Sequence, residues 1–217
     1  RNYRLELSDI SDLVIDDDRY EIFNGIIPYS VKKGDLNYRD NAGELADAVF
    51  KGSNVGSLSG MKMIMPDGTG LRAGIGKILQ KWQSESDFYC SLSELDYEQY
   101  TCSLKNGDFD IALVKISGEY NSPYAYLNDF LSGNSHNYSS YDNEKYAHII
   151  NSALASTSDE QAVAYYKEAE QLLIDSGIFV PLCTEIEYVF YRDNLQGIYY
   201  NPFAGVYCLK RECIINE

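Results

Sequence analysis

Short apolar runs and amphipathic stretches alternate along the middle of the chain, and this order predicts strands and helices in turn. The first apolar run ends at Pro66-Asp67-Gly68, as a strand does before a turn. The second helix is expected to begin at the capping box Asp96-x-x-Gln99 and to end at Asn106-Gly107. The order of strand, helix, strand, helix, strand is typical of a mostly parallel sheet with helices on its faces, so we predict an α/β fold. The expected strands are residues 61–65, 88–92 and 111–116, and the expected helices between them are residues 71–82 and 97–105.

The third of these strands is predicted to be the central one. Apart from Lys115, residues 111–116 are apolar on both faces of the pleat, which favours a strand that is covered on both sides. A helix is expected soon after it, because Ser122 can cap a helix that has Pro123 at its first position.

The loop between this strand and this helix is the candidate binding site. It carries a carboxylate, a phenol and a carboxamide in Glu119, Tyr120 and Asn121. In open α/β sheets, ligands bind in the crevice beyond the carboxyl ends of the strands. We therefore predict that residues 117–121 form the edge of a ligand site.

Two amphipathic helices are predicted after the loop, and we expect them to form a helical hairpin. The first begins at Asp142 or Asn143, and the second begins at the capping box Ser158-x-x-Gln161. Their apolar positions recur at helical spacing and should face the core. The residues expected to face inward are Tyr146, Ile149, Ile150 and Leu154 in the first helix and Val163, Tyr166, Ala169 and Leu173 in the second.

The two ends of the chain have weaker patterns. Before residue 61, we expect helices at residues 7–15 and 41–50, a short turn at residues 19–23 and a loop at residues 28–37. After the helical hairpin, we expect a buried strand at residues 178–182, an alternating strand at residues 186–191 and a tail rich in Tyr and Gly.

Composition narrows the class of protein. Of the 217 residues, 45% are hydrophobic and no apolar run is long enough to span a membrane, which indicates a soluble globular chain. The formal net charge is −15 and no stripe of Lys and Arg is visible, so nucleic acid is not an expected partner. The five cysteines include no C-x-x-C pair, which argues against a zinc site. Because the chain begins with Arg1, we expect it to be a piece of a longer protein.

Motifs for catalysis are absent from the sequence. We find no G-x-S-x-G, no H-E-x-x-H and no P-loop, and the two histidines, His136 and His148, stand in no catalytic pattern. Acidic pairs such as Asp108 and Asp110 are typical of solvated strand edges. We therefore expect no enzyme activity, no cofactor and no metal.

One stretch offers an alternative. Residues 68–73, from Gly68 to Ala73, fit a relaxed dinucleotide fingerprint between a strand and a helix, and Glu94 follows near the end of the next strand. We favour a plain turn, because Pro-Asp-Gly is ordinary turn chemistry. Gly74 and Gly76 would also weaken the helix that has to hold a pyrophosphate.

The run from residue 109 to residue 182 has a recognisable order of motifs. The predicted loop contains Glu119-Tyr120-Asn121-Ser122-Pro123. A later predicted helix contains Tyr166-Lys-Glu-Ala169-Glu170 and is followed by Val180-Pro181-Leu182. An earlier predicted helix ends at Trp82. This order resembles the C-terminal lobe of family 5 extracellular solute-binding proteins, the oligopeptide- and dipeptide-binding components of ABC importers. The resemblance covers about residues 40–190 and lies in the order of the motifs.

The resemblance implies one lobe of a type II periplasmic-binding-protein-like fold, with a mostly parallel or mixed sheet flanked by helices. Residues 1–185 would be the C-terminal lobe of a two-lobed protein, and residues 186–217 a tail that returns to the N-terminal lobe. By position, Glu119 matches the loop acid that pairs with a peptide's N-terminal ammonium in relatives, although an aspartate is usual there. Ile116 replaces a tryptophan of the family.

From this resemblance we expect noncatalytic binding of a solute, an oligopeptide, for uptake by an ABC transporter. The expected contacts are backbone groups of Ile116, Ser117 and Gly118, which pair with an extended ligand, together with Glu119, Tyr120 and Asn121. The implied partners are a peptide or other small solute, the membrane permease and the N-terminal lobe, at an extracellular, lipid-anchored cell-surface or periplasmic location. The alternatives are a solute-sensing domain of a regulator and, less favoured, a nucleotide-binding enzyme domain.

Overall fold

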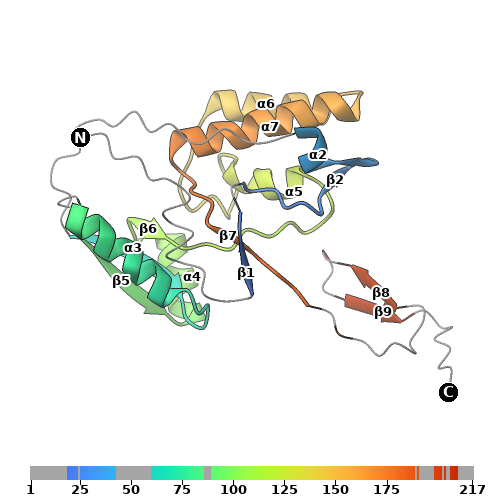
Figure 1. Cartoon of the computed structure of the whole chain (residues 1–217). Helices are drawn as coiled ribbons and strands as arrows, with labels where there is room; N and C mark the ends of the chain where they lie inside the picture. Colours follow the sequence, from blue (N-terminus) through green and yellow to red (C-terminus); the bar gives the residue numbers. More distant parts are fainter. Residues whose placement is uncertain are drawn as a thin grey trace, which may run out of the picture.

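The computed structural model describes residues 19–23, 25–42, 60–85, 89–188, 190, 198–201, 203 and 206–209. Two parts of the chain build most of the described structure (Figure 1). We call residues 60–85 and 89–112 the sheet half, and residues 25–42 and 122–177 the helical half. Residues 113–121, the connecting segment, run from one half to the other. The helix expected at residues 7–15 lies outside the described residues, and so do residues 43–50 of the helix expected at residues 41–50, whose first two residues are helical.

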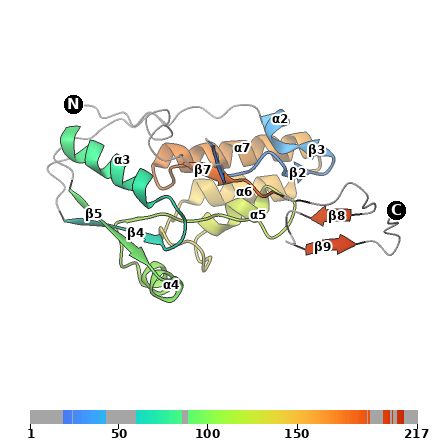
Figure 2. The ribbon, with the colours of Figure 1, turned by 60° about the horizontal axis from the view of Figure 1, so that its bottom comes forward.

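The sheet half has the predicted βαβ order. Strands β4 (Met61–Pro66), β5 (Cys90–Leu95) and β6 (Ile111–Ala112) form a parallel sheet in the order β5-β4-β6. Helices α3 (Arg72–Glu85) and α4 (Tyr97–Asn106) lie on opposite faces of the sheet (Figure 2). The alternation of β4 explains this, because Met63 and Met65 pack under α3 whereas Ile64 packs with Tyr100 and Leu104 of α4.

The ends of α4 follow from local sequence. The Asp96 side chain accepts a hydrogen bond from the Gln99 N–H at 2.9 Å, as the capping box predicts. Gly107 ends the helix in the left-handed conformation with φ of 72°.

The predicted central position of residues 111–116 is wrong for the described sheet, since β4 holds that place and β6 lies at an edge. Pairing of β6 covers two residues, and one further bond joins the Leu113 N–H to the Ile64 carbonyl at 2.9 Å. The Leu113 carbonyl then accepts the Tyr100 hydroxyl at 2.6 Å instead of a strand partner. The apolar run is therefore only half-buried, and its remainder leaves the sheet.

The helical half is organised around the predicted hairpin of α6 (Glu144–Ala155) and α7 (Asp159–Ser176). Asn143 and Ser158 cap these two helices as predicted. Helix α2 (Tyr38–Ala42), helix α5 (Tyr124–Leu127), the 3-10 turn η1 (Asn128–Phe130) and the hairpin of β2 (Lys32–Lys33) and β3 (Leu36–Asn37) complete this half. Seven of the eight residues expected to face inward are buried, but Leu154 is 53% exposed and Ala153 is buried instead.

Several predictions near the chain ends are corrected by pairing between distant residues. Residues 19–23 were expected to turn, but β1 (Tyr20–Ile22) pairs antiparallel with β7 (Cys183–Glu185). The strand expected at residues 178–182 does not form, and Ile178 and Val180 are exposed. Residues 186–188 form no strand either, and residues 189 and 191 lie outside the described part. The expected loop at residues 28–37 contains the β2–β3 hairpin. In the tail, β8 (Ile198–Asn201) pairs with β9 (Val206–Leu209).

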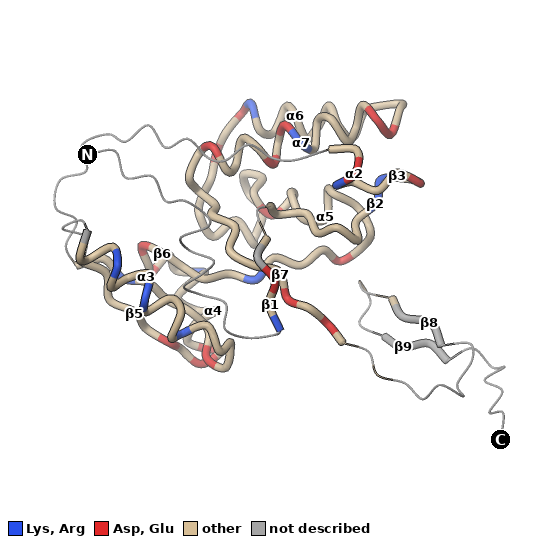
Figure 3. The backbone as a smooth tube through the Cα atoms, in the orientation of Figure 1, with Lys and Arg blue, Asp and Glu red and all other residues tan. Residues whose placement is uncertain are grey.

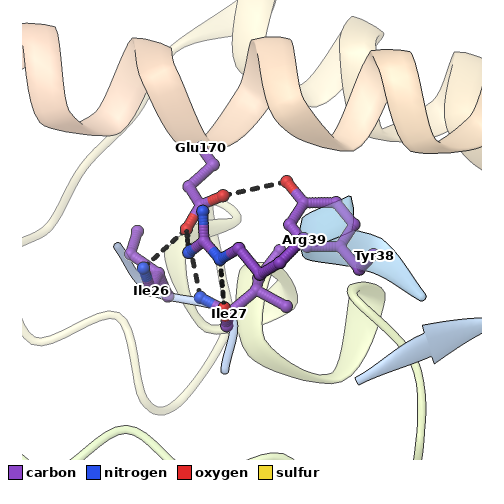
Figure 4. Close-up of polar contacts among 5 residues, drawn as sticks. All are labelled: Ile26, Ile27, Tyr38, Arg39 and Glu170. Carbon is purple, nitrogen blue, oxygen red and sulfur yellow. Dashed lines mark hydrogen bonds and ion pairs between the residues drawn. The ribbon is translucent and has the colours of Figure 1, made fainter. Parts of the chain in front are cut away.

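A buried ion pair joins the two sequence-distant parts of the helical half (Figure 4). Glu170 of α7 is fully buried, and its Oε1 accepts hydrogen bonds from the N–H groups of Ile26 and Ile27 at 2.6 and 3.1 Å. The same oxygen accepts Nη2 of Arg39 at 2.6 Å, and Oε2 accepts the Tyr38 hydroxyl at 2.8 Å. Arg39 Nε donates to the Ile27 carbonyl at 2.7 Å. Every polar group of this cluster thus has a partner, which buried charges require.

Candidate ligand-binding loop

The connecting segment leaves the sheet at the carboxyl end of β6 and crosses to α5 (Figures 1 and 3). Leu113 packs on the sheet core under α3, whereas Ile116 packs on the core of the helical half. Between them, the Lys115 ammonium forms an ion pair with Glu185 of β7. The segment is therefore held by both halves and by β7.

The backbone of the connecting segment has hydrogen-bonding groups to offer. Ile116 and Ser117 form no backbone hydrogen bond with any residue that the structure describes. Gly118 lies against the ring of Tyr126, and a Cβ at this position would come 2.3 Å from Cε2 of that ring. Only glycine permits this approach. The Gly118 backbone already forms a hydrogen bond with the Tyr126 hydroxyl. The backbone groups of Ile116 and Ser117 are therefore the ones to which an extended ligand can add as a strand does.

Glu119 is exposed on this loop, close to a second carboxylate. Burial raises the pKa of Asp129, the hydrogen bond and charge of His136 oppose this rise, and the charge of Glu119 adds to it. His136 Nδ1 lies 3.3 Å from Asp129 Oδ1. The loop therefore presents negative charge to solvent, which suits the binding of a cationic group.

Tyr120 and Asn121, the other two side chains predicted to contact a ligand, differ in their exposure and in their hydrogen bonds. Tyr120 is 46% exposed, and burial, with smaller contributions from Tyr124 and Glu119, raises the pKa of its hydroxyl. Its phenol stays protonated at neutral pH and can donate or accept a hydrogen bond. The Oδ1 of Asn121 already accepts the backbone N–H of Lys32 in β2 at 2.7 Å. Asn121 thus ties the loop to the β2–β3 hairpin.

Sequence reasoning did not place Asp129, Lys32 or the β2–β3 hairpin beside this loop. Lys32 is 89 residues from Asn121, and nothing in its local sequence indicates that contact. Asp129 follows α5 by two residues and belongs to no recognisable motif.

The stretch from Gly68 to Ala73 completes the turn after β4 and begins α3, to which Arg72 and Ala73 belong. The Thr69 carbonyl accepts the Tyr20 hydroxyl at 2.8 Å, so β1 packs over the turn. Glu94, the acid of the alternative reading, pairs with Arg72 at 3.2 Å. In the part of the chain that the structure describes, no group of three or more His, Cys, Asp or Glu could hold a metal ion. None of the described helices is long and apolar enough to cross a membrane.

The fold is that of periplasmic binding proteins. It matches OppA of Haemophilus influenzae in complex with RPPGFSPFR, with a TM-score of 0.70 and 18% identity over 96% of this chain and 44% of that one. It also matches the substrate-binding domain of an oligopeptide ABC transporter from Bacillus anthracis, with a TM-score of 0.69 and 15% identity over 94% of this chain and 42% of that one.

Sequence comparison finds curated relatives of the same kind, whereas no family model matches. The chain is 28% identical to the periplasmic oligopeptide-binding protein OppA of Escherichia coli over 126 residues, which are 58% of this chain and 22% of that protein. It is 27% identical to the probable D,D-dipeptide-binding protein DdpA of the same organism over 100 residues, 44% of this chain and 19% of that protein. The matches thus span about a fifth of each relative. The predicted resemblance to family 5 peptide-binding proteins is confirmed, and the partial coverage fits one lobe.

Proposed function

We propose that this chain is the C-terminal lobe of an extracellular solute-binding protein that captures peptides for an ABC transporter. The sequence similarity to peptide-binding proteins is the observation that carries the proposal. The relatives are named for binding rather than for a reaction, and the sequence holds no catalytic motif, so the role is noncatalytic capture.

The connecting segment is the proposed ligand-binding site. Backbone groups of Ile116, Ser117 and Gly118 pair with an extended peptide, and Glu119 receives its N-terminal ammonium. The exposure of Glu119 supports this role, because the carboxylate is free to meet a ligand. Closing a second lobe over the pair would remove water and strengthen the contact.

The whole protein is proposed to have two lobes. Residues 1–185 belong to the lobe described here, and residues 186–217 form a tail that returns to an N-terminal lobe. The periplasmic location of the relatives supports a periplasmic or extracellular site of action. A lipid anchor at the cell surface and delivery to a membrane permease complete the proposal.

The proposal is tested by titrating the full-length protein with a tripeptide and with its N-acetylated form in a calorimeter. Because a hydrogen bond to a charged group contributes about 1.5–3 kcal/mol, acetylation should weaken binding by about tenfold or more. The variant Glu119→Gln should bind the two peptides almost equally. Glu98→Gln, which removes the same charge from an exposed position on α4, should keep the difference.

Equal binding of both peptides by the wild-type protein would argue against Glu119 as the ammonium site. A dinucleotide tests the alternative site at Gly68 to Ala73 in a thermal-shift assay. A true ligand at 100 times its Kd should stabilise the protein by about 2.7 kcal/mol. We expect no shift.

A further inference from the structure

The β2–β3 hairpin lies beside the connecting segment, which is the proposed ligand-binding site. Its Lys32 donates its backbone N–H to Oδ1 of Asn121, two residues after Glu119. The contact brings together residues that are 89 positions apart, so it fixes the place of the hairpin relative to the ligand loop. The hairpin therefore lies next to the loop that carries Glu119.

The hairpin also contacts α7. The Lys33 ammonium lies 3.4 Å from Oδ1 of Asp159, at the first residue of that helix. The turn approaches so closely that a Cβ on Gly34 would lie 2.1 Å from Oδ2 of Asp159, and Val31 at the base is fully buried. The buried Val31 and the close approach of Gly34 to Asp159 thus set the place of the hairpin, and with it the backbone of Lys32.

The side chains of Lys32 and Lys33 have different surroundings. Successive side chains of a strand point to opposite faces, so Lys32 points away from the face on which Lys33 pairs with Asp159. Lys32 is exposed, and none of the carboxylates in the described part of the chain lies within ion-pair distance of its ammonium. Among the described residues, Lys32 is thus an exposed cation without a carboxylate partner, on the hairpin next to the loop that carries Glu119.

We propose that Lys32 is a specificity-determining residue that pairs with a carboxylate of the ligand while Glu119 holds its ammonium. Asn121 is then a positioning residue, because its carboxamide sets the place of Lys32 relative to the loop. The inference rests on the proposed peptide-binding function and adds a ligand class to it, peptides with a carboxylate within reach of β2. That carboxylate belongs either to the C-terminus or to an Asp or Glu side chain.

Two peptide pairs, titrated into the full-length protein, test this proposal and separate the two sources. The first pair is a peptide with a free C-terminus and its amide, and the second is an amidated peptide with Glu or with Gln at one position. The wild-type protein should prefer the carboxylate member of at least one pair by about tenfold, as a charged hydrogen bond provides. Lys32→Met should abolish this preference and leave binding of the neutral member unchanged.

Lys33→Met is the matched control, since it removes the same charge from the same hairpin but from the other face. It should keep the preference for the carboxylate. Asn121→Ala should reduce the preference without abolishing binding of the amide. Thermal unfolding of each variant shows whether the fold is retained.

Two results would overturn the inference, namely a wild-type protein that is indifferent to the carboxylate, or a Lys32→Met variant that keeps the preference. In both cases the proposed function stands if N-acetylation still weakens binding through Glu119. Failure of every peptide to bind would instead overturn the proposed function, and the role of Lys32 with it.

Discussion

The sheet half and the helical half are both built on buried apolar side chains, but different kinds of contact hold them together. In the sheet half, β4, α3, β5 and α4 follow one another along the chain and pack as neighbours. In the helical half, α7 holds residues 26–39 through Glu170, which meets Arg39 across 131 positions of sequence. In the helical half, a polar contact between distant residues is thus added to an apolar core that itself joins residues 26–42 to α7, whereas the sheet half depends on apolar packing of elements that follow one another in sequence.

The difference matters because losing part of an apolar contact and losing one member of a buried ion pair lower the free energy of unfolding by different amounts. Loss of one methylene in an apolar core costs about 1 kcal/mol, and the remaining contacts persist. Loss of one member of a buried ion pair leaves the other charge without compensation, at a cost of about 3–5 kcal/mol. The helical half should therefore be the more sensitive of the two to a single polar substitution.

The largest effect is expected for Glu170→Gln. The amide retains the size of the side chain but leaves the guanidinium of Arg39, a residue that is 8% exposed, without a counter-charge. We expect the free energy of unfolding to fall by about 3–5 kcal/mol, measured by urea denaturation. The control is Glu168→Gln on the same helix, whose partner Lys145 lies 3.5 Å away at an exposed site. Such a surface pair contributes about 0–1 kcal/mol, so equal effects of the two variants would refute the importance of burial.

A smaller effect is expected for Gly25→Ala. The added Cβ would lie 1.8 Å from Nη2 of Arg39 and 2.8 Å from Oε1 of Glu170, so the ion pair must shift. Overpacking of this kind costs about 1–3 kcal/mol. If the clash is the cause, the same substitution should cost much less in an Arg39→Ala background, which a double-mutant cycle measures by urea denaturation. Additive losses would show that Gly25 matters for another reason.

Local sequence signals were sufficient to predict most of the sheet half. Three features depend only on residues close by in the sequence. They are the turn at Pro66-Asp67-Gly68, the N-terminal cap of α4 at Asp96 and the end of α4 at Gly107. The same holds for the caps Asn143 and Ser158 of the helical hairpin. These features are encoded where they occur, so a sequence pattern reveals them.

Features that depend on distant partners were not predictable. Tyr20–Ile22 forms a strand only because Cys183–Glu185 lies beside it, and periodicity over three residues carries no such information. The apolar run at residues 111–116 indicated burial on both faces, yet its burial comes partly from the two cores that it connects rather than from a central place in the sheet.

The candidate site shows the same limit. The loop from Ile116 to Asn121 was found from its place after a strand and from the resemblance, and its use by a ligand stays a prediction. The β2–β3 hairpin beside it was not predicted, because the bond from Lys32 to Asn121 joins residues 89 positions apart and neither has a local signature for it. Glu170 was noted only as part of a helix motif, and its pairing with Arg39 has no local signature.

The smallest effect, and the only gain, is expected for Gly76→Ala in α3. A Cβ at this position would meet no atom within 4 Å, and the residue lies inside a helix, where glycine costs about 0.5–1 kcal/mol relative to alanine. Urea denaturation should therefore show a rise of about that size in the free energy of unfolding. Gly133→Ala is the matched control, because its surroundings are equally open but its φ of 83° strains any residue with a Cβ. If both substitutions lowered the stability, the sheet half would depend on α3 for something other than helix propensity, and its contrast with the helical half would weaken.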